Sequence, residues 1–116
     1  MSILKVNAVQ NTSGTEMYLA RAWVNFNGTG TVAIRASGNV TSITDNGVGD
    51  YTVNFTTALS DANYATVVTT GQSGISACGQ VNETTAQTTS ARRVFTTNSG
   101  STAAVDCTTV NVAVFR

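Results

Sequence analysis

Apolar and polar side chains alternate along much of the chain, a pattern typical of β-strands with one buried face and one wet face. Residues 51–57 show the alternation most clearly, and residues 22–26 and 30–37 repeat it. The side chains that we expect these strands to send into a shared core include Tyr51, Val53, Phe55, Val32 and Ile34. The pattern therefore predicts packed sheets rather than helices.

Two turns are expected to join these strands into hairpins. Asn27 and Gly28 stand between the first two strands, and both residue types tolerate the positive φ that a tight turn needs. A longer Gly-rich turn, residues 45–50, separates a strand at residues 39–44 from the one at residues 51–57. We therefore predict two consecutive antiparallel hairpins.

Further strands are predicted on either side of this region, whereas residues 75–90 are Thr-rich and show no clear pattern. The predicted ranges are residues 3–9, 63–70, 91–97 and 104–115. The last range becomes apolar on both faces towards its end, which is typical of a central strand or of one packed against a neighbouring subunit. With no helix longer than one turn, the sequence predicts an all-β fold, an antiparallel, jelly-roll-like β-sandwich of about seven or eight strands.

We divide the chain into an N-terminal part, residues 1–19, and a sandwich domain, residues 20–116. The N-terminal part is interpreted either as an arm that attaches the domain to a larger particle or as an ordinary edge strand. Trp23 alternates in phase with its strand instead of lying in a loop. We therefore expect its indole to lie in the core or in a subunit contact, rather than to be a platform for a ligand.

Two runs within this domain carry a family resemblance. They are ARAWVNFNGTGTVAIR at residues 20–35 and SITDNGVGDYTVNFTT at residues 42–57, continued by ALSDANY at residues 58–64. The stretch of residues 20–68 resembles the distal domain of tailed-phage tail fibres and related virion proteins. The resemblance implies a β-rich homotrimer at an extremity of the virion, often used for host attachment. Because this scaffold occupies several virion positions, it implies a virion protein more strongly than a receptor binder.

The charge balance argues against several classes of partner. Six Lys and Arg residues face six Asp and Glu residues, and charged residues make up only 10% of the chain. Such a surface cannot neutralise a run of phosphates, which argues against nucleic-acid binding. No run approaches the ~20 apolar residues of a membrane-spanning helix, so no membrane insertion is expected. No apolar block of signal-peptide length opens the sequence, so we expect synthesis in a host cytoplasm and a final location in the virion.

The side chains available for catalysis are few. The sequence contains no histidine, which excludes Ser-His and Cys-His nucleophile pairs, and two cysteines are too few for a zinc site. Asp45 and Asp50 flank one turn and are candidates for the acid and base of a glycosidase, but aspartates beside a Gly-rich turn ordinarily cap backbone amides, which is the role we expect. Residues 45–50 also lack the ligand spacing of a calcium loop. We predict no enzymatic activity, no cofactor and no metal site.

The two cysteines, Cys78 and Cys107, leave two alternatives open. Synthesis in a cytoplasm favours free thiols, whereas exposure on a particle outside the cell favours a disulfide that would join the poorly patterned middle of the chain to its last strand.

The candidate receptor-binding residues are Asn82 and Glu83, from a predicted loop at residues 80–83 that begins with Gln80, together with Arg92 and Arg93. Consecutive residues of a strand point to opposite faces, so at most one of the two arginines is expected inside. The other would face solvent or a partner, where it would bind sugar hydroxyls or surface carboxylates of a receptor. The alternative is an ordinary surface ion pair with little energetic weight.

The sequence therefore predicts a phage virion protein, a tail-fibre or tail-tip domain that mediates host-surface attachment by non-catalytic binding. One alternative is a structural role, as a head-decoration (cement) or tail-assembly protein, and a third is a carbohydrate-cleaving tailspike enzyme. The expected partners are two further copies of the chain in a homotrimer, other tail or capsid proteins, and a glycan or protein of the host surface.

Overall fold

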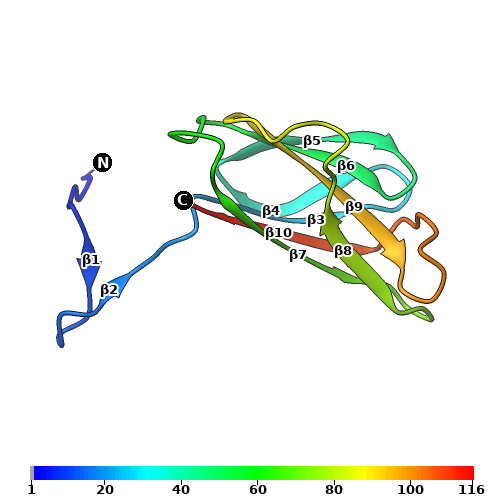
Figure 1. The fold of residues 1–116 in the computed structure, drawn as a ribbon, viewed down its shortest axis with the longest axis horizontal. Helices are drawn as coiled ribbons and strands as arrows, with labels where there is room; N and C mark the ends of the chain where they lie inside the picture. The colour runs from blue at the N-terminus through cyan, green and yellow to red at the C-terminus, as the bar shows by residue number, and fades with distance from the viewer. Residues whose placement is uncertain (1) are drawn as a thin grey trace.

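Eight strands form two packed four-stranded sheets in the computed structural model, which describes residues 2–116 (Figure 1). The β3 sheet has the strand order β4 (Ala33–Gly38), β3 (Ala22–Asn27), β10 (Thr109–Phe115) and β7 (Ala65–Gly71). The β9 sheet has the order β5 (Val40–Gly47), β6 (Asp50–Phe55), β9 (Ala91–Asn98) and β8 (Ala77–Val81). All pairs within the two sheets are antiparallel, which confirms the predicted all-β sandwich.

The two predicted hairpins are confirmed as β3–β4 and β5–β6, and β8–β9 forms a third. The tight turn expected at Asn27 and Gly28 is wrong, because neither residue has a positive φ; the connection is a loop of residues 28–32, in which Gly30 has φ +57°. The second turn is tighter than residues 45–50, because Gly47 already pairs with Asp50 and only two residues remain between them. Gly49 has φ +65°, and a Cβ there would lie 3.0 Å from the backbone nitrogen of Val105. Glycine is therefore required at this position, both because the backbone has a positive φ and because the backbone of Val105 lies too close for a side chain.

Side chains that face inward from both sheets form one core. The predicted row of β6 is confirmed, with Tyr51, Val53 and Phe55 all buried. Tyr51 meets Phe26 of the opposite sheet edge to face, with ring centroids 5.2 Å apart. Such contacts between aromatic rings add directional packing to the burial of apolar surface, which stabilises the pairing of the two sheets.

The last strand is central, as predicted, but shorter than expected. β10 lies between β3 and β7, and Val110, Val112 and Val114 point into the core. Residues 104–108 do not continue it, since Ala104 makes only an isolated bridge and Asp106 turns its carboxylate inward. That carboxylate accepts hydrogen bonds from the Gly49 amide and the Tyr51 hydroxyl, both at 2.8 Å. These contacts hold residues 104–108 in a loop instead of a strand, with the Cys107 side chain buried beneath it.

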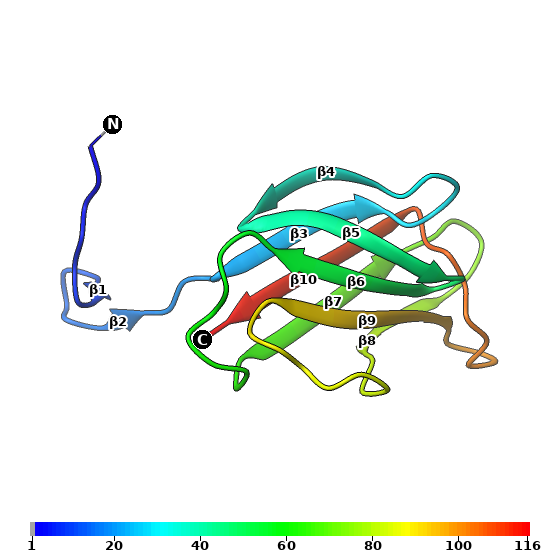
Figure 2. The ribbon, with the colours of Figure 1, turned by 90° about the horizontal axis from the view of Figure 1, so that it is seen from above.

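The N-terminal residues extend away from the sandwich as an arm (Figures 1 and 2). The prediction of a strand at residues 3–9 is wrong, because only β1 (Val9–Gln10) finds a partner, β2 (Glu16–Met17), in a small separate hairpin. Asn11 closes its turn by accepting hydrogen bonds at 3.0 Å from the amides of Ser13 and Thr15. Most apolar side chains of this arm are exposed, which leaves it with little contact to its own sandwich.

Trp23 lies on the outer surface of the β3 sheet, so its predicted place in the core is wrong. Its side chain is 44% exposed, while Ala22 and Val24 point inward. The indole covers Gly38 on the neighbouring strand, where an added Cβ would lie 2.9 Å from Trp23 Cδ1. The alternation of side chains along a strand shows which residues share a face, but it does not show which of the two faces is buried.

The described part of the chain holds no helix with the length and apolar character that crossing a membrane requires.

Candidate functional site

The outer face of the β9 sheet is covered by hydroxyl and amide side chains. On β6, the residues between the buried ones point outward, and their neighbours on β5 hydrogen-bond to them. Asn54 donates to the hydroxyls of Ser42 and Thr44, at 3.1 and 2.9 Å, and Asn46 donates to Thr52 at 2.8 Å. These bonds order a polar surface on which every second residue of each strand is available to solvent.

A hollow of about 470 Å³ lies on this face, and we call it the Arg93 groove. The residues that give it its chemistry are Asp50, Gln80, Asn82, Glu83, Arg93 and Phe95. A smaller hollow of about 240 Å³, lined by Thr52, Thr85 and Thr88 among others, lies on the other side of Arg93. Arg93 therefore stands between two polar depressions.

The strand register explains why these side chains meet. Phe95 of β9 pairs with Asp50 of β6 on one side and with Gln80 of β8 on the other. The three residues form a row across three strands, and Arg93 follows on the same face two positions along β9. Side chains in register on neighbouring antiparallel strands lie about 5 Å apart, so the row places an aromatic ring between a carboxylate and an amide.

Arg93 and Asp50 form a two-point ion pair. Arg93 Nε lies 2.8 Å from Asp50 Oδ1, and Arg93 Nη2 lies 2.6 Å from Asp50 Oδ2. A third nitrogen of Arg93, Nη1, donates to the Thr85 hydroxyl at 2.9 Å. The hydrogen bonds from Arg93 hold the pKa of Asp50 below its ordinary value, although partial burial acts in the opposite direction. Asp50 therefore stays ionised, and the pair carries no net charge.

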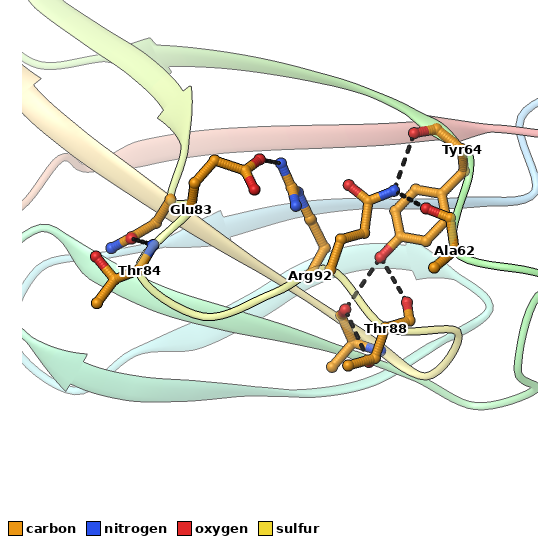
Figure 3. Close-up of polar contacts among 9 residues, drawn as sticks. Ala62, Tyr64, Glu83, Thr84, Thr88 and Arg92 are labelled. Carbon is orange, nitrogen blue, oxygen red and sulfur yellow. Dashed lines mark hydrogen bonds and ion pairs between the residues drawn. The ribbon is translucent and has the colours of Figure 1, made fainter.

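Arg92 points into the sandwich, as the alternation along β9 predicts for one of the two arginines (Figure 3). Its side chain is only 3% exposed, and its Nη2 lies 2.5 Å from Glu83 Oε1. Its Nε and Nη1 atoms are buried without a hydrogen-bond partner in residues 2–116. Arg92 is therefore removed from the candidate contacts of a receptor, and Glu83 neutralises it from the surface.

The loop between β8 and β9, residues 82–90, is held in place by the interior (Figure 3). The Tyr64 hydroxyl lies 2.8 Å from the backbone oxygen of Thr88 and 3.0 Å from that of Ala91. The side chain of Gln87 donates to the backbone oxygens of Ala62 and Tyr64. Asn82 closes the first turn of the loop by accepting a hydrogen bond from the Thr84 amide at 2.9 Å. This anchoring fixes one wall of the Arg93 groove.

Of the four candidate residues, Asn82, Glu83 and Arg93 come together in the groove, whereas Arg92 lies behind it. The sequence did not single out Asp50 and Phe95 as members of this site, and Gln80, expected in a loop, belongs to strand β8. The alternation of Phe95 with Arg93 was a usable signal, because it puts both side chains on one face of the same strand. The contributions of Asp50 and Gln80 depend on strand register, which their local sequence does not encode.

The carboxylates and thiols of the chain take other positions. Asp45 Oδ1 accepts a hydrogen bond from the Gly47 amide at 3.1 Å, which confirms its predicted capping role, whereas Asp50 pairs with Arg93 instead. Both cysteines are free, with Cys78 exposed and Cys107 buried, so the disulfide alternative is wrong. Among residues 2–116, no three potential metal-binding side chains lie close enough together to hold an ion.

The outer face of the β3 sheet has a different chemistry. Its apolar patch consists of Trp23, Val67, Ala113 and Phe115, around a shallow hollow of about 260 Å³ that includes the first three. Phe115 also borders a hollow of about 620 Å³ that Leu19 and neighbouring residues of the arm line. The exposed large apolar side chains of the arm are Ile3, Leu4, Val6, Val9, Met17, Tyr18 and Leu19. Apolar surface therefore continues from the arm onto one side of the sandwich.

No family model matches the sequence, and comparisons with curated proteins and with solved structures also gave no match.

Proposed function

We propose that this chain is a virion protein of a tailed phage, a tail-fibre or tail-tip domain that attaches to the host surface by non-catalytic binding. The observation that carries the proposal is the chemical difference between the two outer faces of the sandwich. One face carries the apolar patch, which continues onto the arm and lies beside the hydrogen-bonded amides of Asn25 and Asn111. The opposite face is polar and holds the Arg93 groove. The resemblance of residues 20–68 to tail-fibre domains supplies the biological setting.

The apolar side of the molecule suits assembly. Contiguous exposed apolar surface on a soluble protein marks sites of contact with other proteins, and here it joins an arm that has few contacts of its own. In the proposed particle, this side meets further copies of the chain in a homotrimer and neighbouring tail or capsid proteins. Burial of Trp23 and Phe115 there would fulfil the expectation of a subunit contact for the tryptophan.

The polar side suits binding of a hydrated surface. Hydroxyl, amide and paired charged groups exchange hydrogen bonds with sugar hydroxyls and with polar protein surfaces alike. The groove lies on the sheet opposite to the apolar patch, so assembly through the patch leaves the groove open to the exterior. In the proposed function, the outer face of the β9 sheet contacts the host surface, and the outer face of the β3 sheet contacts the rest of the particle.

The exposed apolar arm also favours the second candidate, a purely structural cement or tail-assembly subunit. Such a protein needs the arm and the apolar patch, but it has no use for the groove. The two functions therefore differ in what they predict for a groove residue.

Adsorption of phage to host cells tests the proposal. Purified protein, added to host cells before phage, is expected to compete with the phage and to slow adsorption. Arg93→Ala should reduce this competition, whereas Arg35→Ala, which changes an exposed arginine of β4 on the other sheet, should leave it intact. Absence of competition by the unaltered protein would contradict the attachment function, and equal competition by both variants would exclude the groove from it.

A further inference from the structure

The charges in the Arg93 groove are already matched within the chain. Arg93 is held by Asp50 through two hydrogen bonds, and the buried Arg92 is held by Glu83. Asp50 and Glu83 both line the groove, whereas Arg92 lies behind its wall. The groove therefore offers an anionic ligand no unpaired positive charge, and the carboxylates of Asp50 and Glu83 are the charged groups at its lining beside Arg93. Like charges brought together in a binding site cost affinity, so the groove disfavours anions.

The groove also offers an aromatic surface. Phe95 is partly exposed on the same face as Arg93 and lies in register between Asp50 and Gln80. The ring contributes apolar surface to the lining of the groove, and its register partners on the two neighbouring strands carry hydrogen-bonding groups. A pyranose ring has the same division, because its C–H groups form an apolar face and its hydroxyls lie around the edge. Binding sites for small molecules commonly combine apolar walls with a few placed polar groups in this way.

The polar groups around Phe95 match hydroxyls in particular. A hydroxyl both donates and accepts, whereas a carboxylate only accepts and a guanidinium only donates. Asp50 accepts one hydrogen bond on each oxygen from Arg93, and the amides of Asn46 and Asn82 also donate towards it, so a sugar hydroxyl would share the carboxylate with these groups. Gln80 and Asn82 add amides that donate and accept. Vicinal hydroxyls can therefore bridge Asp50 and Arg93, donating to the carboxylate and accepting from the guanidinium.

From these observations we propose that the Arg93 groove binds a neutral carbohydrate, with the sugar ring packed on Phe95 and its hydroxyls bound by Asp50, Arg93 and Gln80. This inference rests on the proposed attachment function and narrows its ligand to neutral rather than acidic glycans. The volume of about 470 Å³ lies within the range of sites for small ligands.

Titration of the isotope-labelled protein, followed by NMR, tests the ligand class. The probes are glucose, galactose, mannose and N-acetylglucosamine, with glucuronic, galacturonic and mannuronic acids as charged counterparts of the first three. At least one neutral sugar is expected to shift the amide signals of Gln80, Asn82 and Phe95. The signals of Val67 and Asn111, on the opposite sheet, should stay in place. The matching uronic acid is expected to bind at least tenfold more weakly.

Two pairs of variants test the residues. Phe95→Ala should weaken binding of the neutral sugar about tenfold, equivalent to ~1.4 kcal/mol. Phe115→Ala, the matched change on the other sheet, should leave the affinity unchanged. Asp50→Asn removes the carboxylate that neutralises Arg93, so it should raise the affinity for the uronic acid relative to the neutral sugar. If Asp50 only maintains the structure of the groove, Asp50→Asn should weaken the binding of both ligands equally.

Several results would overturn the inference. They are no shift with any neutral sugar, shifts confined to the β3 sheet, equal or tighter binding of uronic acids by the unaltered protein, and equal effects of the two phenylalanine variants. These results would leave the attachment function intact if the protein still competes with phage for host cells. Loss of that competition is the result that counts against the function itself.

Discussion

Arg93 of β9 donates two hydrogen bonds, 2.8 and 2.6 Å long, to the carboxylate of Asp50 on the neighbouring strand β6. The two side chains stand diagonally across the strands, because Arg93 pairs in register with Thr52, two residues beyond Asp50. The contact joins two strands on the outer face of the β9 sheet and gives the groove its neutral character. The ionisation state of Asp50 therefore affects both the stability of the β9 sheet and the charge of the Arg93 groove.

Acid should weaken the protein through Asp50. Its folded pKa lies below the ordinary value of 3.8 because Arg93 donates hydrogen bonds to the ionised form. The resulting stabilisation is present above the unfolded pKa, and it is lost as the pH falls below about 4 through the folded pKa. Asp50→Asn should therefore show a smaller loss of stability than the unaltered protein between about pH 6 and pH 3, measured by urea unfolding.

Asp61 provides the control for that experiment. Its hydrogen bonds to Arg116 lower its pKa to about 2, so it also contributes to acid sensitivity. Asp61→Asn should remove a separate part of the acid response and leave sugar binding unaffected, since Asp61 lies outside the groove. An Asp50→Asn protein that loses as much stability in acid as the unaltered protein would contradict the role of the Arg93 contact.

Removal of Glu83 should be costly although its own side chain is 67% exposed. Glu83→Gln leaves Arg92 as a buried charge whose Nε and Nη1 already lack partners among residues 2–116. A buried charged group without a partner destabilises a protein strongly, and we expect a loss of about 2 kcal/mol in the free energy of unfolding. Denaturant unfolding at neutral pH measures it.

A double-mutant cycle isolates this interaction. Arg92→Leu removes the buried charge together with the need for a partner, so it should cost less than Glu83→Gln. In the Arg92→Leu background, Glu83→Gln should then have almost no effect, because nothing remains for Glu83 to neutralise. Additive effects of the two substitutions would show that Glu83 does not act through Arg92.

Trp23 gives a direct report on the apolar patch, since it is the one tryptophan of the sequence. A Cβ at Gly38 would collide with the indole, with Trp23 Cδ1 at 2.9 Å. Gly38→Ala should therefore displace the ring, change its fluorescence emission and destabilise the protein by about 1 kcal/mol. Gly71→Ala is the matched control, because its Cβ would make only an ordinary contact of 3.6 Å with Thr109. Equal emission spectra for both variants would contradict the position of the indole.

The two thiols should react at different rates. Cys78 is exposed, whereas Cys107 is buried, and burial raises the pKa of the Cys107 thiol. A thiol reagent should therefore label one cysteine in the native protein and both after unfolding, because thiolate is the reactive form. Mass spectrometry of the unreduced protein distinguishes the outcomes, and Cys78→Ser should abolish native labelling. Failure to label either cysteine after unfolding would indicate the disulfide that the structure lacks.

Local sequence was sufficient to predict many of the strands and core residues of the sandwich. Alternation placed Tyr51, Val53 and Phe55 in the core, and Asn27-Gly28 marked the first hairpin. It was insufficient where a tertiary contact replaced a strand, as at Asp106, whose carboxylate is drawn inward by Gly49 and Tyr51. β8 was missed because residues 77–81 have a glycine at their centre and only one β-branched residue, Val81, and their edge position depends on pairing with β9.

In the candidate site too, local sequence predicted some features, and tertiary contacts decided the others. Alternation along β9 was enough to separate an inward arginine from an outward one, although it did not say that Arg92 was the inward member. The partners of Arg93 come from β6 and from the loop after β8, 43 and 8 residues away in the sequence. Only the register of three strands brings Asp50, Phe95 and Gln80 into one row.

Electron microscopy of intact phage particles, labelled with an antibody against this protein, tests the proposed place of the protein on the virion. We expect label at the far end of the tail or of its fibres, where the β9 sheet would meet the host surface. Label over the head or the tail body would contradict host attachment and indicate a cement or structural subunit. Particles without any label would contradict the assignment to the virion itself.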